Sequence, residues 1–278
     1  MITSQTGSLG LLGHPVGHSK SPEMMNAALK AMEMPYIYLA YDVSPDELKQ
    51  AVEGMKALKF RGWNVTIPHK VAIIPHLDEL DDSAREIGAV NTVVYHQGRW
   101  IGHNTDGAGY LRSLTEEIDI RLSEQRVVLL GAGGAARAVG YALATAGAEK
   151  ITIANRTVEK AEQLAEHLSR WTRTAAVSIT DSKTAVEEAT LVVNTTSVGM
   201  YPCTEESPIP ADWLHEGHIV SDLVYRPRQT AFLIAGQEKG AQIHTGLGML
   251  IHQAAIALEL WMGKPAPIPL MKQVLEIS

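Results

Sequence analysis

Short apolar runs alternate with stretches of helical periodicity along the first hundred residues. The apolar runs have the composition of buried strands and cover 9–13, 36–43, 62–66, 89–95 and 99–103. Gln97-Gly98 is a turn signal that joins the last two runs into a predicted hairpin. Recurrent Met and Ala predict a helix over 21–34, where Pro22 suits the first turn, and Pro45 starts a second helix that runs to Leu58.

A second alternating set follows a long helix that we expect to begin at Thr105-Asp106. Its predicted strands are 126–130, 150–154, 191–194 and 218–222, and its predicted helices are 134–146, 158–169 and a strongly apolar 246–263. Alternation of this kind favours parallel sheets covered by helices on both faces. Single hydrophobic cores stop growing at roughly 250–300 residues. A chain of 278 residues is therefore predicted to be an α/β protein of two domains.

Composition narrows the class of protein. A hydrophobic fraction of 45% and a charged fraction of 20% are typical of a globular chain. The net charge of -7 argues against a nucleic-acid partner, because such proteins carry basic surfaces. No secretory signal and no apolar run near the ~18–20 residues of a membrane span are visible, so we expect a cytoplasmic protein with no membrane contact. The single cysteine, Cys203, excludes an internal disulfide and favours an inert loop residue.

One segment has the pattern of a dinucleotide-binding turn. The predicted strand 126–130 runs into Gly131, Gly133 and Ala136, which fit G-x-G-x-x-A at the start of a helix. Gly131 permits the tight turn, Gly133 lets the backbone approach a pyrophosphate, and Ala136 allows the helix to pack closely on the strand. The predicted cofactor loop comprises Gly131, Ala132, Gly133, Gly134 and Ala135.

The end of the next strand predicts which cofactor is bound. An Asp or Glu that would bind the ribose hydroxyl of NAD is absent near Asn155. Arg156 and Thr157 stand there instead, and Lys160 adds a second positive charge. An Arg can pair with the 2′-phosphate of NADP. The sequence therefore favours NADP over NAD, although solvated residues at a helix start are the ordinary alternative.

Polar segments follow several of the predicted strands of the first half. They are His14–Pro22, Asn64–Lys70, Gly88–Thr92 and Gly102–Gly107. In open α/β sheets, ligands bind beyond the carboxyl ends of strands. Hydroxyls, an amide, an ammonium and a carboxylate could converge there on a polyhydroxylated ligand. The ordinary alternatives are a surface lysine at Lys70, and helix capping by Asp106 and Ser21.

Eight motifs together resemble the shikimate dehydrogenase family. In order they are H-P-V-x-H-S-x-S-P, N-V-T-I-P-H-K, G-A-V-N-T, N-T-D-G, G-A-G-G-A, N-R-T, N-T-T-S-V-G-M and G-x-x-M-L-x-x-Q-A, and they extend over nearly the whole chain. The resemblance implies reversible, NADPH-dependent reduction of 3-dehydroshikimate to shikimate.

The resemblance also implies roles for particular residues. Lys70 matches the family's catalytic proton donor and acceptor, and Asp106 matches the aspartate that orients both substrate and lysine. The implied substrate contacts are Ser19, Ser21, Thr66, Asn91, Tyr225 and Gln253. Asn155, Arg156, Thr157 and Lys160 match the clamp on the adenosine phosphate, and Leu223 and Gly246 match the nicotinamide side. The family often has Arg at the position of Lys160, so a less strict NADP preference is expected here.

The implied domains are a substrate-binding domain of 1–104 plus 246–278, with a mainly parallel sheet, and a Rossmann-type NADP-binding domain of 105–245. The substrate is expected in a cleft that closes on it, and monomer and homodimer stay open. Three alternatives remain: a quinate/shikimate dehydrogenase that also accepts NAD, a dinucleotide-binding regulator without turnover, and a folate-type dehydrogenase. The histidines at 14, 18, 69, 103 and 252 lack metal-ligand spacing, so no metal is expected.

Overall fold

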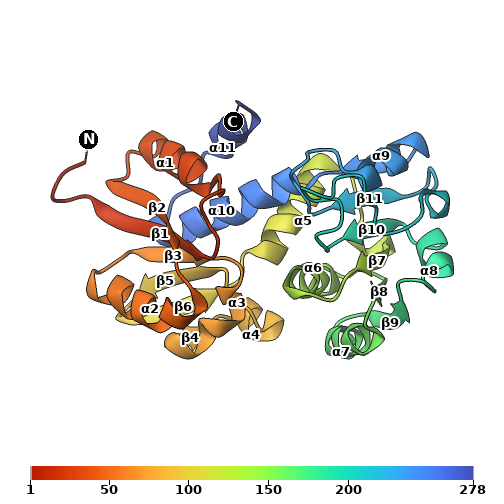
Figure 1. The fold of residues 1–278 in the computed structure, drawn as a ribbon, viewed down its shortest axis with the longest axis horizontal. Coiled ribbons are helices and arrows are strands. Elements are labelled where there is room, and N and C mark those ends of the chain that lie inside the picture. Colours follow the sequence, from red (N-terminus) through yellow and green to blue (C-terminus); the bar gives the residue numbers. More distant parts are fainter. Residues whose placement is uncertain (1, 278) are drawn as a thin grey trace. The chain divides into compact units, whose positions relative to one another are not determined.

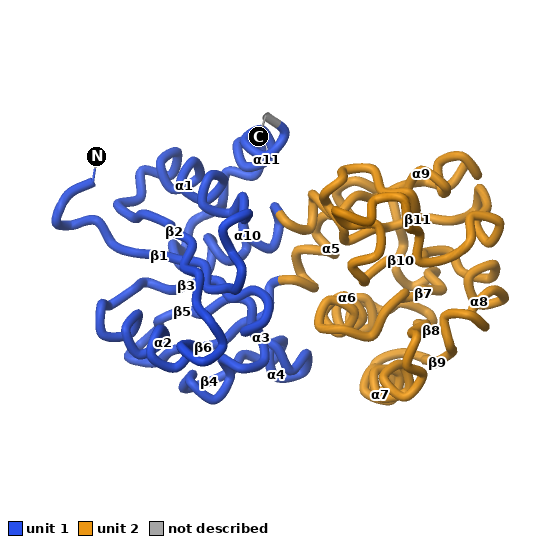
Figure 2. The backbone as a smooth tube through the Cα atoms, viewed as in Figure 1, with its two compact units in different colours: residues 1–105, 251–278 blue, residues 106–250 orange. Residues whose placement is uncertain are grey.

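The chain folds into two compact α/β units. The computed structural model describes residues 2–277. One unit holds the residues up to 105 together with those from 251 onward, and the other holds residues 106–250 (Figure 2). The boundaries between the units, at 105/106 and 250/251, lie one residue and five residues later than the predicted boundaries of 104/105 and 245/246. The second boundary differs because α10 (Gly246–Met262) runs unbroken from one unit into the other.

The first unit is built on a mixed six-stranded sheet of order β2-β1-β3-β5-β6-β4 (Figure 1). Its strands are β1 (Gly7–Gly13), β2 (Tyr36–Asp42), β3 (Gly62–Val65), β4 (Glu79–Leu80), β5 (Thr92–His96) and β6 (Arg99–His103). Its helices are α1 (Ser21–Ala31), α2 (Leu48–Ala57), α3 (His69–Ala72), α4 (Asp82–Ile87) and α11 (Ile268–Ile277). α11 packs beside α1, so the C-terminal end of the chain returns to the N-terminal unit.

The two antiparallel pairings of this sheet both involve β5. β5 pairs with β3 and with β6 in antiparallel register, whereas β1–β2, β1–β3 and β4–β6 are parallel. The turn between β5 and β6 has positive φ at both central residues, 48° at Gln97 and 83° at Gly98. Two such residues make the tight hairpin turn whose twist matches that of the strands. The hairpin predicted from Gln97-Gly98 is confirmed.

Because Gly62 has no side chain, the Trp261 ring can pack against β3 in the core of the first unit. The Trp261 indole Nε1 donates a 2.9 Å hydrogen bond to the Val93 carbonyl. A Cβ at Gly62 would collide with that indole nitrogen and with the same carbonyl. The packing of α10 on β3 and β5 therefore requires glycine at this position.

We expect Gly62→Ala to lower the free energy of unfolding by about 2 kcal/mol, because the added methyl overpacks a rigid backbone contact. Chemical denaturation measures the change. Gly54→Ala is the matched control: a Cβ at Gly54, inside α2, meets no atom within 4 Å. That variant should gain about 0.5–1 kcal/mol from the lost flexibility of glycine. Equal stabilities of the two variants would refute the steric explanation.

The second unit has a fully parallel six-stranded sheet of order β12-β11-β10-β7-β8-β9. Its strands are β7 (Arg126–Leu130), β8 (Lys150–Asn155), β9 (Arg173–Ser178), β10 (Leu191–Asn194), β11 (Ile219–Asp222) and β12 (Gln242–His244). Its helices are α5 (Asp106–Glu117), α6 (Gly134–Thr145), α7 (Val158–Leu168), α8 (Lys183–Glu187) and α9 (Ala231–Glu238). The strand order reverses at β7, which is the doubly wound Rossmann arrangement.

A buried histidine directly before β11 leads us to expect that acid destabilises the second unit. His218 Nδ1 accepts a hydrogen bond from the His215 backbone N–H at 3.2 Å, and Nε2 donates to the Val186 carbonyl at 2.9 Å. Burial, with the nearby His215 ring second, lowers the pKa of His218 from 6.5 to about 4. A proton on Nδ1 would point at an N–H group, so folding requires the neutral ring.

Because the folded-state pKa lies below the unfolded value, stability is fully present above about pH 6.5 and is lost as the pH falls toward about 4. We expect a loss of about 2 kcal/mol between about pH 7 and about pH 4.5 from this group. Urea titrations over that range measure it. His218→Asn should flatten the slope, whereas His96→Asn, at an exposed position, should not. Equal slopes in all three proteins would contradict this assignment.

Within residues 2–277, no helix is both long enough and apolar enough to cross a membrane.

Candidate active site

Sheet topology brings four polar segments to one edge of the first unit. β1 and β3 are parallel, so their carboxyl ends lie together, followed by Ser19 and by Thr66. Asn64 near the end of β3 pairs with Thr92, and Thr92 pairs with His103. β5 therefore begins, and β6 ends, at that same edge. Asn91 and Thr105 are placed there by the strand order alone.

Hydrogen bonds join two of these polar residues, Asn91 and Thr105, to Gln253 on α10. Asn91 Nδ2 donates to Thr105 Oγ1 at 3.0 Å and to Gln253 Oε1 at 3.5 Å. The Thr105 backbone N–H donates to Asn91 Oδ1 at 2.8 Å, and its hydroxyl donates to the Gln253 carbonyl at 3.0 Å. Asn91 is only 2% exposed and Gln253 is half-buried. α10 thus presents Gln253 at a fixed place beside the residues that begin β5.

A second set of buried polar groups forms hydrogen bonds with the backbone of Asn91 and with its neighbour Thr92. Tyr38, on β2, donates its hydroxyl to Asn64 Oδ1 at 2.7 Å. Asn64 Nδ2 donates to the Asn91 carbonyl at 3.2 Å and to Thr92 Oγ1 at 3.0 Å. Sequence reasoning identified Asn64 and Thr92 only as parts of motifs and missed Tyr38. The available signal was the presence of polar side chains at positions that the strand pattern predicts to be buried.

Lys70 is the second residue of the one-turn helix α3, and its segment is held on two sides. Its carbonyl accepts from the Val90 N–H at 2.8 Å, and the buried His69 ring contacts the Val43 carbonyl through Nε2 at 2.7 Å. The Lys70 side chain is half-buried. These contacts fix the backbone from which the lysine extends, in the short helix that follows the carboxyl end of β3.

The serine loop after β1 keeps both hydroxyl-bearing side chains half-buried. Ser19 Oγ accepts a 3.2 Å hydrogen bond from the Ser21 backbone N–H. The capping role considered for Ser21 is wrong, because Ser21 is the first residue of α1 and Lys20 occupies the cap position. Asp106 is likewise the first residue of α5 rather than the one before it, and it is 8% exposed. A carboxylate that is so buried at a helix start is favoured by the helix dipole.

The glycine turn after β7 has the geometry that its motif predicts. Gly131 has φ +112°, and a Cβ there would lie 2.7 Å from Thr195 Oγ1. Both facts require glycine. A Cβ at Gly133, in contrast, would meet no heavy atom of the chain within 4 Å. The space in front of Gly133, at the amino end of α6, is open to a ligand whose charge suits unpaired N–H groups.

A small cavity of about 170 Å³ gathers most of the predicted cofactor residues of this unit. It is lined by Ala132, Gly133, Asn155, Arg156, Thr157 and Lys160. Asn155 Nδ2 donates to the Thr157 carbonyl at 2.8 Å, which orders the turn after β8. Arg156 and Lys160 are exposed cations at its rim. This set of donors and positive charges fits an adenosine phosphate.

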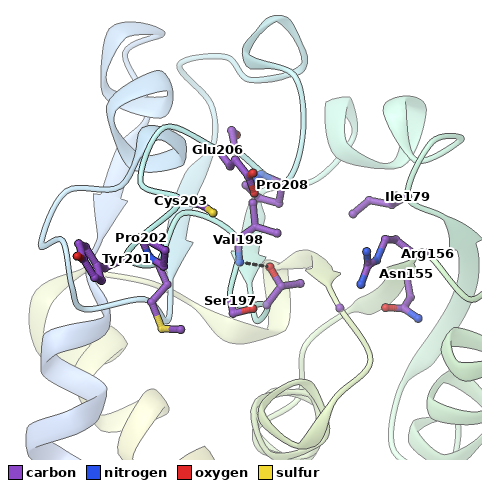
Figure 3. A pocket seen from close by; sticks show the side chains of 14 residues that line it. Asn155, Arg156, Ile179, Ser197, Val198, Tyr201, Pro202, Cys203, Glu206 and Pro208 are labelled. Atoms are coloured by element: carbon purple, nitrogen blue, oxygen red, sulfur yellow. Dashed lines mark hydrogen bonds between the residues drawn. The ribbon is translucent and has the colours of Figure 1, made fainter. Parts of the chain in front are cut away.

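A larger cavity of about 680 Å³ adjoins the first and shares Asn155 and Arg156 with it. Figure 3 shows these two residues on one side and Tyr201 to Cys203 on the other. Its remaining wall includes Gly131 and the segment 196–198 after β10. This segment belongs to the motif N-T-T-S-V-G-M, but none of its residues was predicted as a site residue. The available signal was three polar residues, Thr195, Thr196 and Ser197, directly after a buried strand. Cys203 is exposed in this wall.

The last two predicted cofactor residues meet at the start of α10. A Cβ at Gly246 would collide with the Leu223 carbonyl and lie 2.9 Å from the Asp222 carbonyl. Glycine therefore lets α10 begin directly against the end of β11. Tyr225, two residues beyond Leu223, is 39% exposed. The structure thus places Leu223, Tyr225 and Gly246 at the carboxyl edge of the second sheet.

Comparisons with known proteins identify the family. Models of the shikimate dehydrogenase substrate-binding domain, of shikimate/quinate 5-dehydrogenase and of the shikimate 5′-dehydrogenase C-terminal domain match residues 11–93, 113–209 and 246–276. The NADP⁺-dependent shikimate dehydrogenase of Moorella thermoacetica is 50% identical over 278 residues, which cover 99% of this chain and 94% of that protein. The chain belongs to the shikimate dehydrogenase family. 

Solved structures of this family have the same fold. A shikimate dehydrogenase in complex with NADP⁺ superimposes with a TM-score of 0.93 at 42% identity, covering 100% of this chain and 97% of the other. The Thermus thermophilus enzyme in complex with NADP(H) and shikimate gives 0.89 at 39% identity, covering 98% and 99%. The predicted two-domain α/β fold is confirmed.

Two of the histidines considered as metal ligands, His14 and His103, lie beside carboxylates. His14 Nδ1 lies 2.6 Å from Asp42 Oδ1, and this hydrogen bond is the main cause of a lowered Asp42 pKa. His103 Nδ1 lies 3.1 Å from Asp81 Oδ2. In the described part of the chain, no group of three or more His, Cys, Asp or Glu side chains could hold a metal ion.

Proposed function

We propose that this chain is an NADP-dependent shikimate dehydrogenase that interconverts shikimate and 3-dehydroshikimate. One observation carries the proposal: the buried Asn91–Thr105–Gln253 network lies at the sheet edge that also carries the segments of Ser19, Thr66 and Lys70. Hydroxyl, amide and ammonium groups in that number suit a small ligand with several hydroxyls and a carboxylate. Membership of the family over nearly the whole chain supports the same substrate class.

The residues of the second unit fit NADP as cofactor. Gly133 leaves space at the amino end of α6 for a pyrophosphate, and the cavity beyond it ends on Arg156, Thr157 and Lys160. Arg156 and Lys160 supply the positive charge, and Thr157 the hydroxyl, that a 2′-phosphate requires. NADPH, when bound, supplies the hydride for the reduction. The protein supplies position and the proton.

We assign the proton step to Lys70. Its ammonium Nζ hydrogen-bonds the ketone oxygen of 3-dehydroshikimate and gives that oxygen its proton. In the oxidation direction the neutral amine takes the proton of the shikimate hydroxyl. Asp106 accepts a hydrogen bond from a neighbouring substrate hydroxyl and so fixes the ring orientation.

The remaining predicted contacts hold the substrate without an arginine. Ser19 and Ser21 donate hydroxyl hydrogen bonds to the carboxylate, and Thr66, Asn91 and Gln253 bind the ring hydroxyls. The network around Asn91 keeps its amide in one orientation, because both its nitrogen and its oxygen already have partners in the protein. Tyr225, which follows β11 in the second unit, is the last of the proposed substrate contacts.

The nearest rival is a quinate/shikimate dehydrogenase that also accepts NAD. Initial rates with shikimate or quinate, each paired with NADP⁺ or NAD⁺, decide between the two functions. We expect the highest kcat/KM for shikimate with NADP⁺. A higher value for quinate or NAD⁺ would move the assignment to the broader dehydrogenase, and NADP⁺ binding without turnover in any pair would favour the regulator.

A cytoplasmic location and the number of chains in the active particle stay predictions. Light scattering of the purified protein distinguishes a monomer from a homodimer.

A further inference from the structure

A buried carboxylate at the end of β11 has no part in the mechanism above. Asp222 is fully buried and accepts three hydrogen bonds from three different segments. Oδ1 accepts from Asn194 Nδ2 at 3.0 Å and from the Val224 N–H at 2.9 Å, and Oδ2 accepts from the Thr230 hydroxyl at 2.6 Å. Burial raises the pKa of Asp222 to about 6, so the group is an anion at neutral pH.

The hydrogen bond between Asp222 and Asn194 connects Asp222 to the segment that lines the larger cavity. The Asn194 amide also shapes the segment that follows β10. The same Nδ2 donates to the Val198 carbonyl at 3.1 Å, and Oδ1 accepts from the Thr196 N–H at 3.0 Å and from the Thr196 hydroxyl at 2.7 Å. Thr196, Ser197 and Val198 line the cavity together with Gly131 and Arg156. The orientation of one amide therefore determines the shape of this wall.

The segment after β10 also contacts the glycine turn of the cofactor loop. Thr195 Oγ1 donates to the Leu130 carbonyl at 2.7 Å, and Thr195 and Thr196 are the neighbours that a Cβ at Gly131 would meet. A shift of the segment would thus displace the turn that receives the pyrophosphate.

We propose that Asp222 is a positioning residue for the cofactor site, which it shapes through Asn194 while it anchors the Leu223–Tyr225 segment through the Val224 N–H. The inference rests on the proposed function, because it concerns affinity for NADP. Asp222 does not touch the cavity and acts only through the residues that it orients. Its bond to Thr230 serves a separate purpose, since Thr230 caps α9.

This separation provides matched variants. Asp222→Ala removes all three acceptors. Asp222→Asn keeps an oxygen for Asn194 Nδ2 and the Val224 N–H, so it should rescue most of the effect. Thr230→Val removes only the α9 cap and the bond to Oδ2. Asn194→Ala removes the amide that Asp222 orients and leaves Asp222 itself in place.

Two readouts are needed: the dissociation constant of NADP⁺ by calorimetry, and amide hydrogen exchange of residues 194–200 in the ligand-free protein. We expect Asp222→Ala and Asn194→Ala each to weaken NADP⁺ binding at least about tenfold and to speed exchange in that segment. Asp222→Asn should stay within about threefold of the unchanged protein. Thr230→Val should lower the melting temperature and leave affinity within about twofold.

Unchanged affinity and exchange in Asn194→Ala would overturn the proposal, even if Asp222→Ala does not fold. So would a loss of affinity in Thr230→Val equal to that in the other variants, since a merely structural role would act in both. A failure of the unchanged protein to bind NADP⁺ would refute the proposed function instead, while the exchange measurement would still decide the role of Asp222.

Discussion

Replacement of Lys70 by Met should lower kcat for shikimate oxidation by about a thousandfold. General acid–base catalysis by a positioned side chain contributes typically 10²–10⁴-fold. Met keeps the length and apolar stem of lysine but can neither accept nor donate the proton. Because Asn91, Thr105 and Gln253 hydrogen-bond to one another, we expect the KM for shikimate to change by less than about fivefold.

Steady-state kinetics with saturating NADP⁺ measures both constants. Lys49→Met is the matched control, because Lys49 is an exposed lysine on α2 of the same unit. The kcat and KM of this variant should equal those of the unchanged protein. If Lys70→Met raised KM and left kcat unchanged, the lysine would only bind substrate, and the proton step would have to be reassigned.

Replacement of Arg156 by Ala should weaken binding of NADP⁺ by about 10- to 100-fold. A hydrogen bond to a charged group contributes about 1.5–3 kcal/mol, and the cation Arg156 lines both cavities beyond the glycine turn. NAD⁺ lacks the 2′-phosphate, so its weaker binding should change by less than about threefold. Calorimetric titration of each variant with both dinucleotides measures the difference.

Lys160→Arg provides the opposite change at the same rim. A guanidinium can form the two-pronged contact that an ammonium cannot, so the preference for NADP⁺ over NAD⁺ should rise severalfold. Equal losses of both dinucleotides in Arg156→Ala would contradict the phosphate clamp and favour a role for Arg156 in adenine stacking alone.

Local signals in the sequence were sufficient for much of the fold. The strands 126–130 and 191–194 were predicted with the bounds that the structure has, because continuous apolar runs in a buried parallel sheet leave little ambiguity. β9 (Arg173–Ser178) was missed because it is an edge strand with small side chains and no fully buried residue. α4 was missed because it has only six residues, although Asp81 caps it through the Ala84 N–H.

The candidate site was predictable as a set of segments but not as a network. Polar segments after strands indicated where Ser19, Lys70, Asn91 and Asp106 would gather, since strand ends share a sheet edge. The hydrogen bond between Asn91 and Gln253 joins residues 162 positions apart, and no local pattern encodes it. The roles of Asn194 and Asp222 were invisible for the same reason: each depends on which strands are neighbours.

The measurement that tests the central claim most directly is the oxidation of shikimate by NADP⁺ in the purified protein, followed by the absorbance of NADPH. The account predicts steady turnover, formation of 3-dehydroshikimate in equal amount to NADPH, and collapse of the rate in Lys70→Met. The absence of turnover in a folded protein that still binds NADP⁺ would contradict it and leave a cofactor-binding protein without this activity.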